Sequence, residues 1–358
     1  MQINELLKLM VNKGASDLHL TVPSPPVFRI DGKLIPQQDL PPMTAKDIEL
    51  TLEQVANEEQ RAVFEKEWEM DFAYAVPGLA RFRVNVLRQR GVISLAFRFV
   101  PFYIPSIDEL GLPQIFKELI LKPRGIILIT GPSGSGKSTT LAAMLRHLNE
   151  NATENVITVE DPIEFLFSNK KSLIRQRDLG DDTKSFATAV IHALRHDADV
   201  IVIGEMRDLD TISTAITAAE TGHLVLGTLH TVDAPQSIDR VIDVFPPGQQ
   251  QQIRIQLSQV IEAVISQALL PRIDGGRIAA FEIMLASHTI RRYIRDEKIF
   301  EIPVTMEVSR PEGMQTLDQA LTDLVRKKIV TLEDALMKSR DPVKLQRLLQ
   351  SQGEATMS

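Results

Sequence analysis

Residues 125–138 read GIILITGPSGSGKS, a short apolar run that leads into a glycine-rich loop ending in Lys137 and Ser138. The stretch from Gly131 to Ser138 fits the pattern G-x-x-x-x-G-K-[ST], in which backbone N–H groups turn inward around phosphate oxygens. The lysine of this pattern supplies a cation for the β- and γ-phosphates, and the serine hydroxyl is a ligand for Mg²⁺. An ordinary glycine- and serine-rich connecting loop is the alternative. The apolar strand before the loop and the helix after it favour a nucleotide site.

The sequence around this loop alternates between short apolar strands and helices. Strands are expected at 125–130, 156–160, 200–204 and 224–229, and helices from Ser138 onward, near 185–195 and at 211–221. This alternation is typical of a parallel sheet with helices on both faces. Beyond Pro271 the sequence predicts a hairpin-like pair around Gly275 and Gly276, followed by several amphipathic helices.

Residues 1–100 have a different pattern, which is typical of a small α+β domain with an antiparallel sheet. Asp31 and Gly32 separate two apolar segments and predict a hairpin. Thr44 is expected to cap one helix running to about Glu65, and residues 81–100 alternate as two strands broken at Gly91. The proline-punctuated stretch 101–113 is the predicted linker to a second domain, residues 114–358.

Composition narrows the class of protein further. A length of 358 residues suggests two domains. A net charge of −7 disfavours a nucleic-acid partner, and the absence of cysteine excludes disulfides and thiolate metal sites. Glu5 and Lys8 interrupt any signal peptide, and no apolar run approaches the roughly 20 residues of a membrane helix. We therefore expect no membrane insertion.

Acidic residues follow two of the predicted strands. Residues 156–159 run into Glu160, Asp161 and Glu164, and residues 200–204 run into Glu205. Ligands of open α/β sheets bind outside the carboxyl ends of the strands. Phosphoryl transfer to water needs one carboxylate to orient the water and another to hold Mg²⁺ through its water shell. A helix cap or turn is the structural alternative for Glu160 and Asp161.

His230 closes the strand 224–229 at the same edge of the sheet. A histidine after a strand is often structural, but this position beside the phosphate loop predicts a phosphate sensor or proton partner.

Four motifs, in order along the chain, resemble those of secretion-superfamily ATPases. Residues 131–139 resemble the Walker A motif, 158–165 the Asp box, 202–208 the Walker B motif and 219–231 the His box. The segments 13–20 and 28–34 resemble the start of the retraction ATPases of bacterial type IV pili, the PilT/PilU group. The resemblance extends from residue 1 to about residue 349.

This resemblance implies a PAS-like N-terminal domain joined to a RecA-like ATPase domain with C-terminal helices. It implies a homohexamer that hydrolyses Mg-ATP between subunits and powers pilus retraction and twitching motility. The partners implied are the platform protein of the inner-membrane pilus machinery and a PilU-type paralogue. The location implied is the cytoplasmic face of the inner membrane.

The resemblance also implies roles for individual residues. Glu164 matches the general base, with Glu160 as the alternative. Glu205 matches the Walker B acid that holds Mg²⁺ through water together with Ser138, and His230 matches the second histidine of the His box. Arg81 and Arg83 match arginines offered to a nucleotide, with solvated strand-face charges as the alternative. The ATP-binding residues implied are Gly131, Pro132, Ser133, Gly134, Ser135, Gly136, Lys137, Ser138 and Thr139.

Other functions stay open at this point. An accessory retraction ATPase of the PilU type fits the same motifs. Pilus extension and type II secretion ATPases usually have a longer N-terminal region and a four-cysteine metal element. The sequence contains no cysteine, which argues against this group. A RecA-like DNA motor would show salt-sensitive DNA binding, and a non-hydrolysing nucleotide switch would not need the paired acids.

The segment 289–296 matches the position of the family's retraction-coupling motif but differs from it in sequence. Ile290 and Ile294 lie on one face of the expected helix, whereas Arg291 and Arg295 form a basic edge four residues apart. We expect this edge to be an exposed coupling surface. An ordinary amphipathic helix is the alternative.

Overall fold

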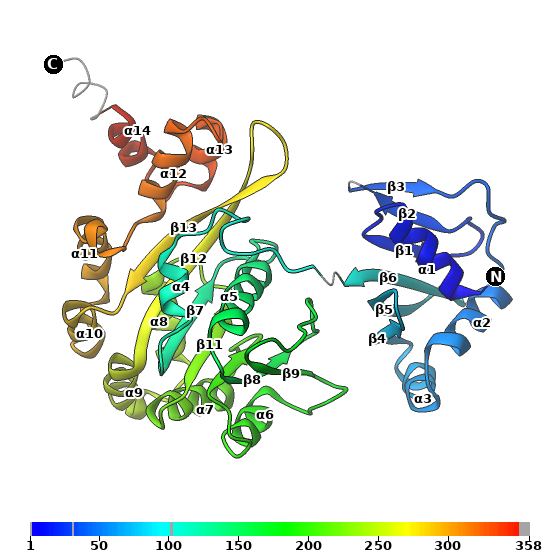
Figure 1. The fold of residues 1–358 in the computed structure, drawn as a ribbon, viewed down its shortest axis with the longest axis horizontal. Helices are drawn as coiled ribbons and strands as arrows, with labels where there is room; N and C mark the ends of the chain where they lie inside the picture. The colour runs from blue at the N-terminus through cyan, green and yellow to red at the C-terminus, as the bar shows by residue number, and fades with distance from the viewer. Residues whose placement is uncertain (1, 31, 101–102, 351–358) are drawn as a thin grey trace. The chain divides into compact units, whose positions relative to one another are not determined.

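A computed structural model describes residues 2–30, 32–100 and 103–350. It divides into two units: unit 1 is Met1–Tyr103 with Glu164–Leu166, and unit 2 is Ile104–Ile163 with Phe167–Ser358. Asp31 of the expected hairpin and residues 101–102 of the expected linker lie outside the described part of the chain. The fold class is the one expected, a small α+β unit and a larger α/β unit with C-terminal helices (Figure 1).

Unit 1 contains a six-stranded antiparallel sheet in the order β3-β2-β1-β6-β5-β4. Alternate residues of β5, such as Phe82 and Val84, are buried, and the residues between them face away from this core. Its strands are β1 (Asp17–Leu20), β2 (Val27–Ile30), β3 (Lys33–Pro36), β4 (Glu69–Val76), β5 (Ala80–Gln89) and β6 (Val92–Val100).

The helices of unit 1 are α1 (Ile3–Asn12), α2 (Ala45–Val55) and α3 (Glu58–Glu67). The prediction of a single helix from Thr44 to about Glu65 is wrong, because α2 ends at Val55 and a second helix, α3, begins at Glu58. Asn57 caps the second helix, its side chain accepting the N–H of Gln60 while the Gln60 side chain accepts the N–H of Asn57. This reciprocal capping box starts a new helix.

Unit 2 is organised around a seven-stranded sheet in the order β13-β12-β7-β11-β10-β8-β9, parallel except for β13. The four predicted strands and the hairpin are present. The strand β9 and the pairing of β12 with β7 were not foreseen. The strands are β7 (Gly125–Thr130), β8 (Asn155–Glu160), β9 (Leu173–Asp178), β10 (Val200–Ile203), β11 (Leu224–Leu229), β12 (Ile261–Pro271) and β13 (Arg277–Leu285).

Helices cover both faces of this sheet, as Figure 1 shows. In β7, Ile126 and Leu128 pack into one core together with α7 and α9, whereas Ile127 and Ile129 pack into another together with α4 and α5. Because alternate side chains enter different cores, both faces of the central strands are buried. The helices are α4 (Ile115–Leu119), α5 (Lys137–Asn151), α6 (Phe186–Ala193), α7 (Leu209–Glu220), α8 (Ala234–Asp243) and α9 (Pro247–Val260).

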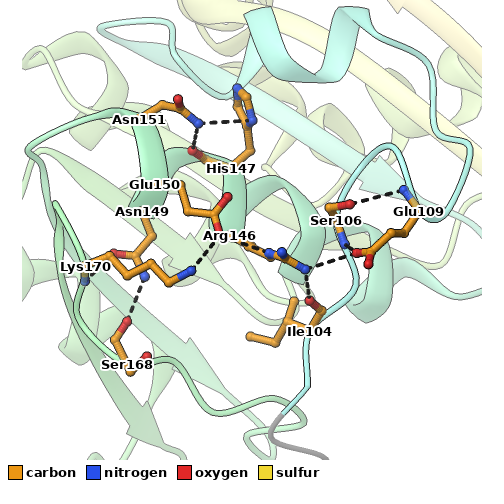
Figure 2. A network of polar contacts seen from close by, with 10 residues as sticks. All are labelled: Ile104, Ser106, Glu109, Arg146, His147, Asn149, Glu150, Asn151, Ser168 and Lys170. Atoms are coloured by element: carbon orange, nitrogen blue, oxygen red, sulfur yellow. Dashed lines mark hydrogen bonds and ion pairs between the residues drawn. The ribbon is translucent and has the colours of Figure 1, made fainter.

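Arg146 of α5 fixes the segment that opens unit 2 (Figure 2). Its Nη1 donates to the carbonyl of Ile104 at 2.6 Å and lies 3.1 Å from Glu109 Oε2. Its Nε donates to Glu150, whose carboxylate also accepts from Lys170. The part of the predicted linker from Ile104 onward is therefore held on α5.

The C-terminal helices pack on the hairpin formed by β12 and β13. Leu321 of α12 and Leu345 of α14 share a small core with Leu270 and Ala280 of the hairpin. The buried Asp318 carboxylate accepts the Ser339 hydroxyl at 2.7 Å and so ties the end of α13 to α12. These elements are α10 (His288–Arg295), η1 (Ile299–Glu301), α11 (Ile302–Val308), η2 (Arg310–Glu312), α12 (Leu317–Arg326), α13 (Leu332–Lys338) and α14 (Pro342–Gln350).

Arg291 on α10 corrects one expectation. Ile290 and Ile294 are buried as expected, but Arg291 does not form an exposed edge with Arg295. Its guanidinium donates to the carbonyls of Ala286, Ser258 and Gln259 and to Glu262 Oε1, the last at 2.6 Å. A helical wheel cannot foresee this, because the acceptors belong to other segments. Arg295 is half exposed and pairs with its neighbour Asp296.

Within the described residues, no helix combines the length and the apolar character needed to cross a bilayer.

Candidate nucleotide site

The glycine-rich loop lies at the carboxyl end of β7 and leads directly into α5. Every residue of β7 is buried, so the strand is a rigid support for the loop. Gly131, Gly134 and Gly136 have φ angles of +140°, +76° and +90°, which favour glycine. α5 begins at Lys137, and its N-cap residue, Gly136, has no side chain that could accept a hydrogen bond from the first N–H groups of the helix. The first N–H groups of a helix have no intrahelical partner, so this helix end is suited to an anion.

Lys137 lies folded over the loop. Its ammonium donates to the carbonyl of Gly131 at 2.7 Å and to that of Pro132 at 3.2 Å. The cation is thus held against the first residues of the loop. Phosphate oxygens bound there would meet a positive charge already in position.

The neighbouring strand ends bring Glu205 and His230 together. His230 Nε2 lies 2.9 Å from Glu205 Oε1, and Arg207 also pairs with this carboxylate. Burial acts to raise the pKa of Glu205, but the hydrogen bond from Arg207 and the contact with His230 outweigh it, so the pKa is lowered. Glu205 is therefore an ionised carboxylate at neutral pH.

Strand order explains this meeting. β11 lies between β7 and β10, with Leu229 opposite Thr130 and Gly227 opposite Ile203. The residues that follow these strands consequently emerge beside one another. His230 stands between the glycine-rich loop and Glu205.

The two acids after β8 differ in their surroundings. Glu160 Oε1 accepts the Thr158 hydroxyl at 2.6 Å and the Gln176 amide at 3.1 Å, so it is engaged with β8 and β9. Glu164 is exposed and follows the buried Ile163. The two carboxylates are thus chemically distinct, one hydrogen-bonded within the sheet and one open to water.

Arg81 and Arg83 lie on β5 of unit 1, on the opposite face of the strand from Phe82. Arg83 Nε lies 3.3 Å from Asp71 Oδ1 of the neighbouring strand, and the side chains of Arg83 and Asp71 are 42% and 50% exposed. Both arginines therefore lie on the face of this sheet opposite the buried core, where they are partly exposed.

The oxygen donors of unit 2 fit Mg²⁺ bound with a nucleotide. Mg²⁺ is commonly held by one or two protein oxygens together with substrate phosphates and water. The Ser138 hydroxyl in the first turn of α5 and the ionised Glu205 are donors of this kind. Across residues 2–30, 32–100 and 103–350, no group of three or more His, Cys, Asp or Glu residues is arranged to hold a metal by itself.

Comparison with known proteins decides the family. The family model described as "Type II/IV secretion system protein" matches residues 1–275. The chain belongs to this family. This secretion ATPase is 46% identical to the type IV pilus retraction ATPase PilT of Pseudomonas aeruginosa, covering 96% of this chain and 99% of that protein. It is 40% identical to the type IV pilus ATPase PilU of the same organism, covering 94% and 88%.

A solved structure is similar along nearly the whole secretion ATPase. The crystal structure of the pilus retraction motor PilT with bound ADP superposes with a TM-score of 0.92 at 46% identity, covering 97% of this chain and 99% of that chain. The ADP in that relative agrees with the nucleotide-binding chemistry of the glycine-rich loop.

Two residues of the site, Arg207 and Gln267, were not predicted from the sequence. Arg207 pairs with Glu205, and its position two residues after the acid was the available signal. Gln267 is buried beneath the glycine-rich loop. Its signal was a polar residue inside the apolar run 263–270, but only the pairing of β12 with β7 shows what it meets.

Proposed function

We propose that this chain hydrolyses Mg-ATP as one subunit of a hexameric ring, and that the ring powers type IV pilus retraction and twitching motility. The observation that carries the proposal is the pairing of Glu205 with His230 beside the loop that holds Lys137. A non-hydrolysing nucleotide switch would need the phosphate loop but not these two side chains. The ionised acid and its histidine partner add the groups that phosphoryl transfer to water requires.

Lys137 neutralises charge on the transferring phosphoryl group, and the loop N–H groups hold the other phosphates. Ser138 and, through water, Glu205 would hold Mg²⁺, which supplies charge neutralisation on the phosphates when bound. His230 reports the state of the γ-phosphate to Glu205 through their hydrogen bond. The remaining loop residues, from Gly131 to Thr139, shape the cradle.

Glu164 is the proposed general base. Its carboxylate is open to water, whereas Glu160 already accepts hydrogen bonds from Thr158 and Gln176. A base must take a proton from water, and a carboxylate occupied by two donors is less able to do so.

Partners and location follow from the same proposal. Arg81 and Arg83 would contact a nucleotide from the face of β5 that points away from the core of unit 1. The ring would act on the platform protein at the cytoplasmic face of the inner membrane, alongside a PilU-type paralogue. The greater identity to PilT than to PilU supports the principal rather than the accessory role.

The test combines a purified protein with cells. Lys137→Ala should abolish ATP hydrolysis and fail to restore twitching to a strain that lacks its retraction ATPase. Lys171→Ala, an exposed lysine outside the loop, is the matched control and should behave as the unaltered protein. Specific activity should also fall on dilution below the concentration at which rings form. Near-normal turnover by Lys137→Ala, or full activity of demonstrably monomeric protein, would contradict the proposal.

A further inference from the structure

Gln267 is a buried polar residue in the strand that flanks the phosphate loop. It lies on β12 with 4% of its surface exposed. β12 runs parallel to β7, with Ser266 opposite Thr130. Gln267 is therefore the next residue along, at the level where β7 ends and the loop begins.

Its carboxamide connects the loop to the helix that follows. Nε2 donates to the carbonyl of Ser135 at 2.7 Å, and Oε1 accepts the hydroxyl of Thr140 at 2.8 Å. Thr140 is 1% exposed, and its place in the first turns of α5 is fixed by packing. The two hydrogen bonds span the segment that contains Gly136, Lys137 and Ser138.

Two glycines of the motif lie directly against this residue. A Cβ on Gly131 would lie 2.5 Å from the Gln267 carbonyl oxygen, and a Cβ on Gly136 would lie 2.8 Å from Gln267 Nε2. Gly131 thus packs on the main chain of β12, and Gly136 packs on the carboxamide of Gln267. Displacing the carboxamide would remove both the support and the hydrogen bond that sets the direction of the Ser135 carbonyl.

We propose that Gln267 is a positioning residue that holds the phosphate loop in its phosphate-binding conformation before nucleotide arrives. The inference rests on the proposed ATPase function and assigns to β12 a role in nucleotide affinity. A loop held in its bound conformation loses less conformational freedom when the ligand binds. A carboxamide suits the position because it provides one donor and one acceptor in a fixed geometry.

The first experiment measures the affinity of the full-length protein for fluorescently labelled ADP. Gln267→Met keeps the approximate size of the side chain and removes both hydrogen bonds. We expect the Kd for ADP to rise about tenfold, the effect of losing one to two hydrogen bonds of ordinary strength. We expect kcat at saturating ATP to fall less than about threefold, because bound nucleotide then holds the loop in place.

Thr140→Val tests the same bond from its other end and keeps the packing of α5. Its effect on ADP affinity should be less than additive with that of Gln267→Met, because both remove the Oε1 contact. This pair keeps the inference testable if either single variant is poorly stable.

The matched control is Gln319→Met. Gln319 is also a buried glutamine, whose amide donates to the carbonyl of Glu307 away from the loop. The Gln319→Met substitution should lower thermal stability without changing the Kd for ADP. If Gln267→Met changes affinity no more than this control, or if its effect adds fully to that of Thr140→Val, the positioning role is wrong. Failure of the unaltered protein to bind ADP would instead overturn the proposed function.

Discussion

Replacing Arg291 with alanine should destabilise unit 2 strongly, whereas replacing its neighbour Arg295 should not. Arg291 is 27% exposed in its side chain and joins α10 to the junction between α9 and β12. Alanine would leave three main-chain carbonyls and Glu262 without this donor. Glu262 would keep its ion pair with Lys122 at 2.8 Å, so the carboxylate would not be stranded.

The magnitude follows from these contacts. A net contribution of about 1 kcal/mol for each hydrogen bond to a carbonyl gives a loss of about 3 kcal/mol in the free energy of unfolding. For a unit of this size that corresponds to a fall in Tm of roughly 6–12 °C. Arg295 is half exposed and its ion pair is with its neighbour Asp296, so Arg295→Ala should change stability by about 0.5 kcal/mol or less.

Thermal unfolding followed by far-UV circular dichroism measures this difference. Tryptophan fluorescence is unsuitable, because the single tryptophan, Trp68, lies in unit 1 and does not report the unfolding of unit 2. Equal and small Tm shifts for the two variants would refute the reasoning, since the carbonyl contacts would then contribute nothing. The expected result also means that Arg291→Ala cannot serve as a test of coupling to the pilus machinery. A loss of twitching in that variant would follow from a damaged fold.

Two other predictions concern carboxylates. Glu164→Gln should bind Mg-ATP normally and lose about 10²-fold or more in kcat, measured by phosphate release; the reverse pattern, with Glu160→Gln inactive and Glu164→Gln active, would move the base to Glu160. Burial raises the pKa of Glu282 from 4.5 to about 7 despite a hydrogen bond from the Ala234 N–H. The protonated form therefore favours the folded state below pH 4.5, and this contribution is lost as pH rises through about 7. Compared with Glu282→Gln, the unaltered protein should lose about 3 kcal/mol of unfolding free energy across that window, and urea titrations showing a constant difference would contradict it.

Much of the fold could be predicted because its signals are local. The strand 125–130, the loop after it and the helix that follows are adjacent in the sequence, and their periodicity is clear. The alternation of residues 81–100 likewise gave β5 and β6. The missed helix break was also local, since Asn57 and Gln60 have the spacing of a capping box.

What could not be predicted depends on contacts between distant segments. The pairing of β12 with β7 brings Gln267 beneath the loop, although more than a hundred positions separate them in the chain. The burial of Arg291 depends on carbonyls of Ser258 and Gln259. The site residues divide in the same way, because the motif identified Lys137 and Glu205, but only strand order shows that His230 meets Glu205.

The strand β12 serves two regions of unit 2 at once. Near its middle Gln267 supports the phosphate loop, and near its end Leu270 lies in the core of the C-terminal helices. These two points are three residues apart, or about 10 Å along an extended strand. β12 pairs with β7 as far as Ser266, and from Gln267 to Leu270 it pairs with β13, so this short stretch is held in an extended conformation. A force applied to the C-terminal helices would therefore reach the nucleotide loop through a short, paired stretch of β-strand and not through a flexible linker.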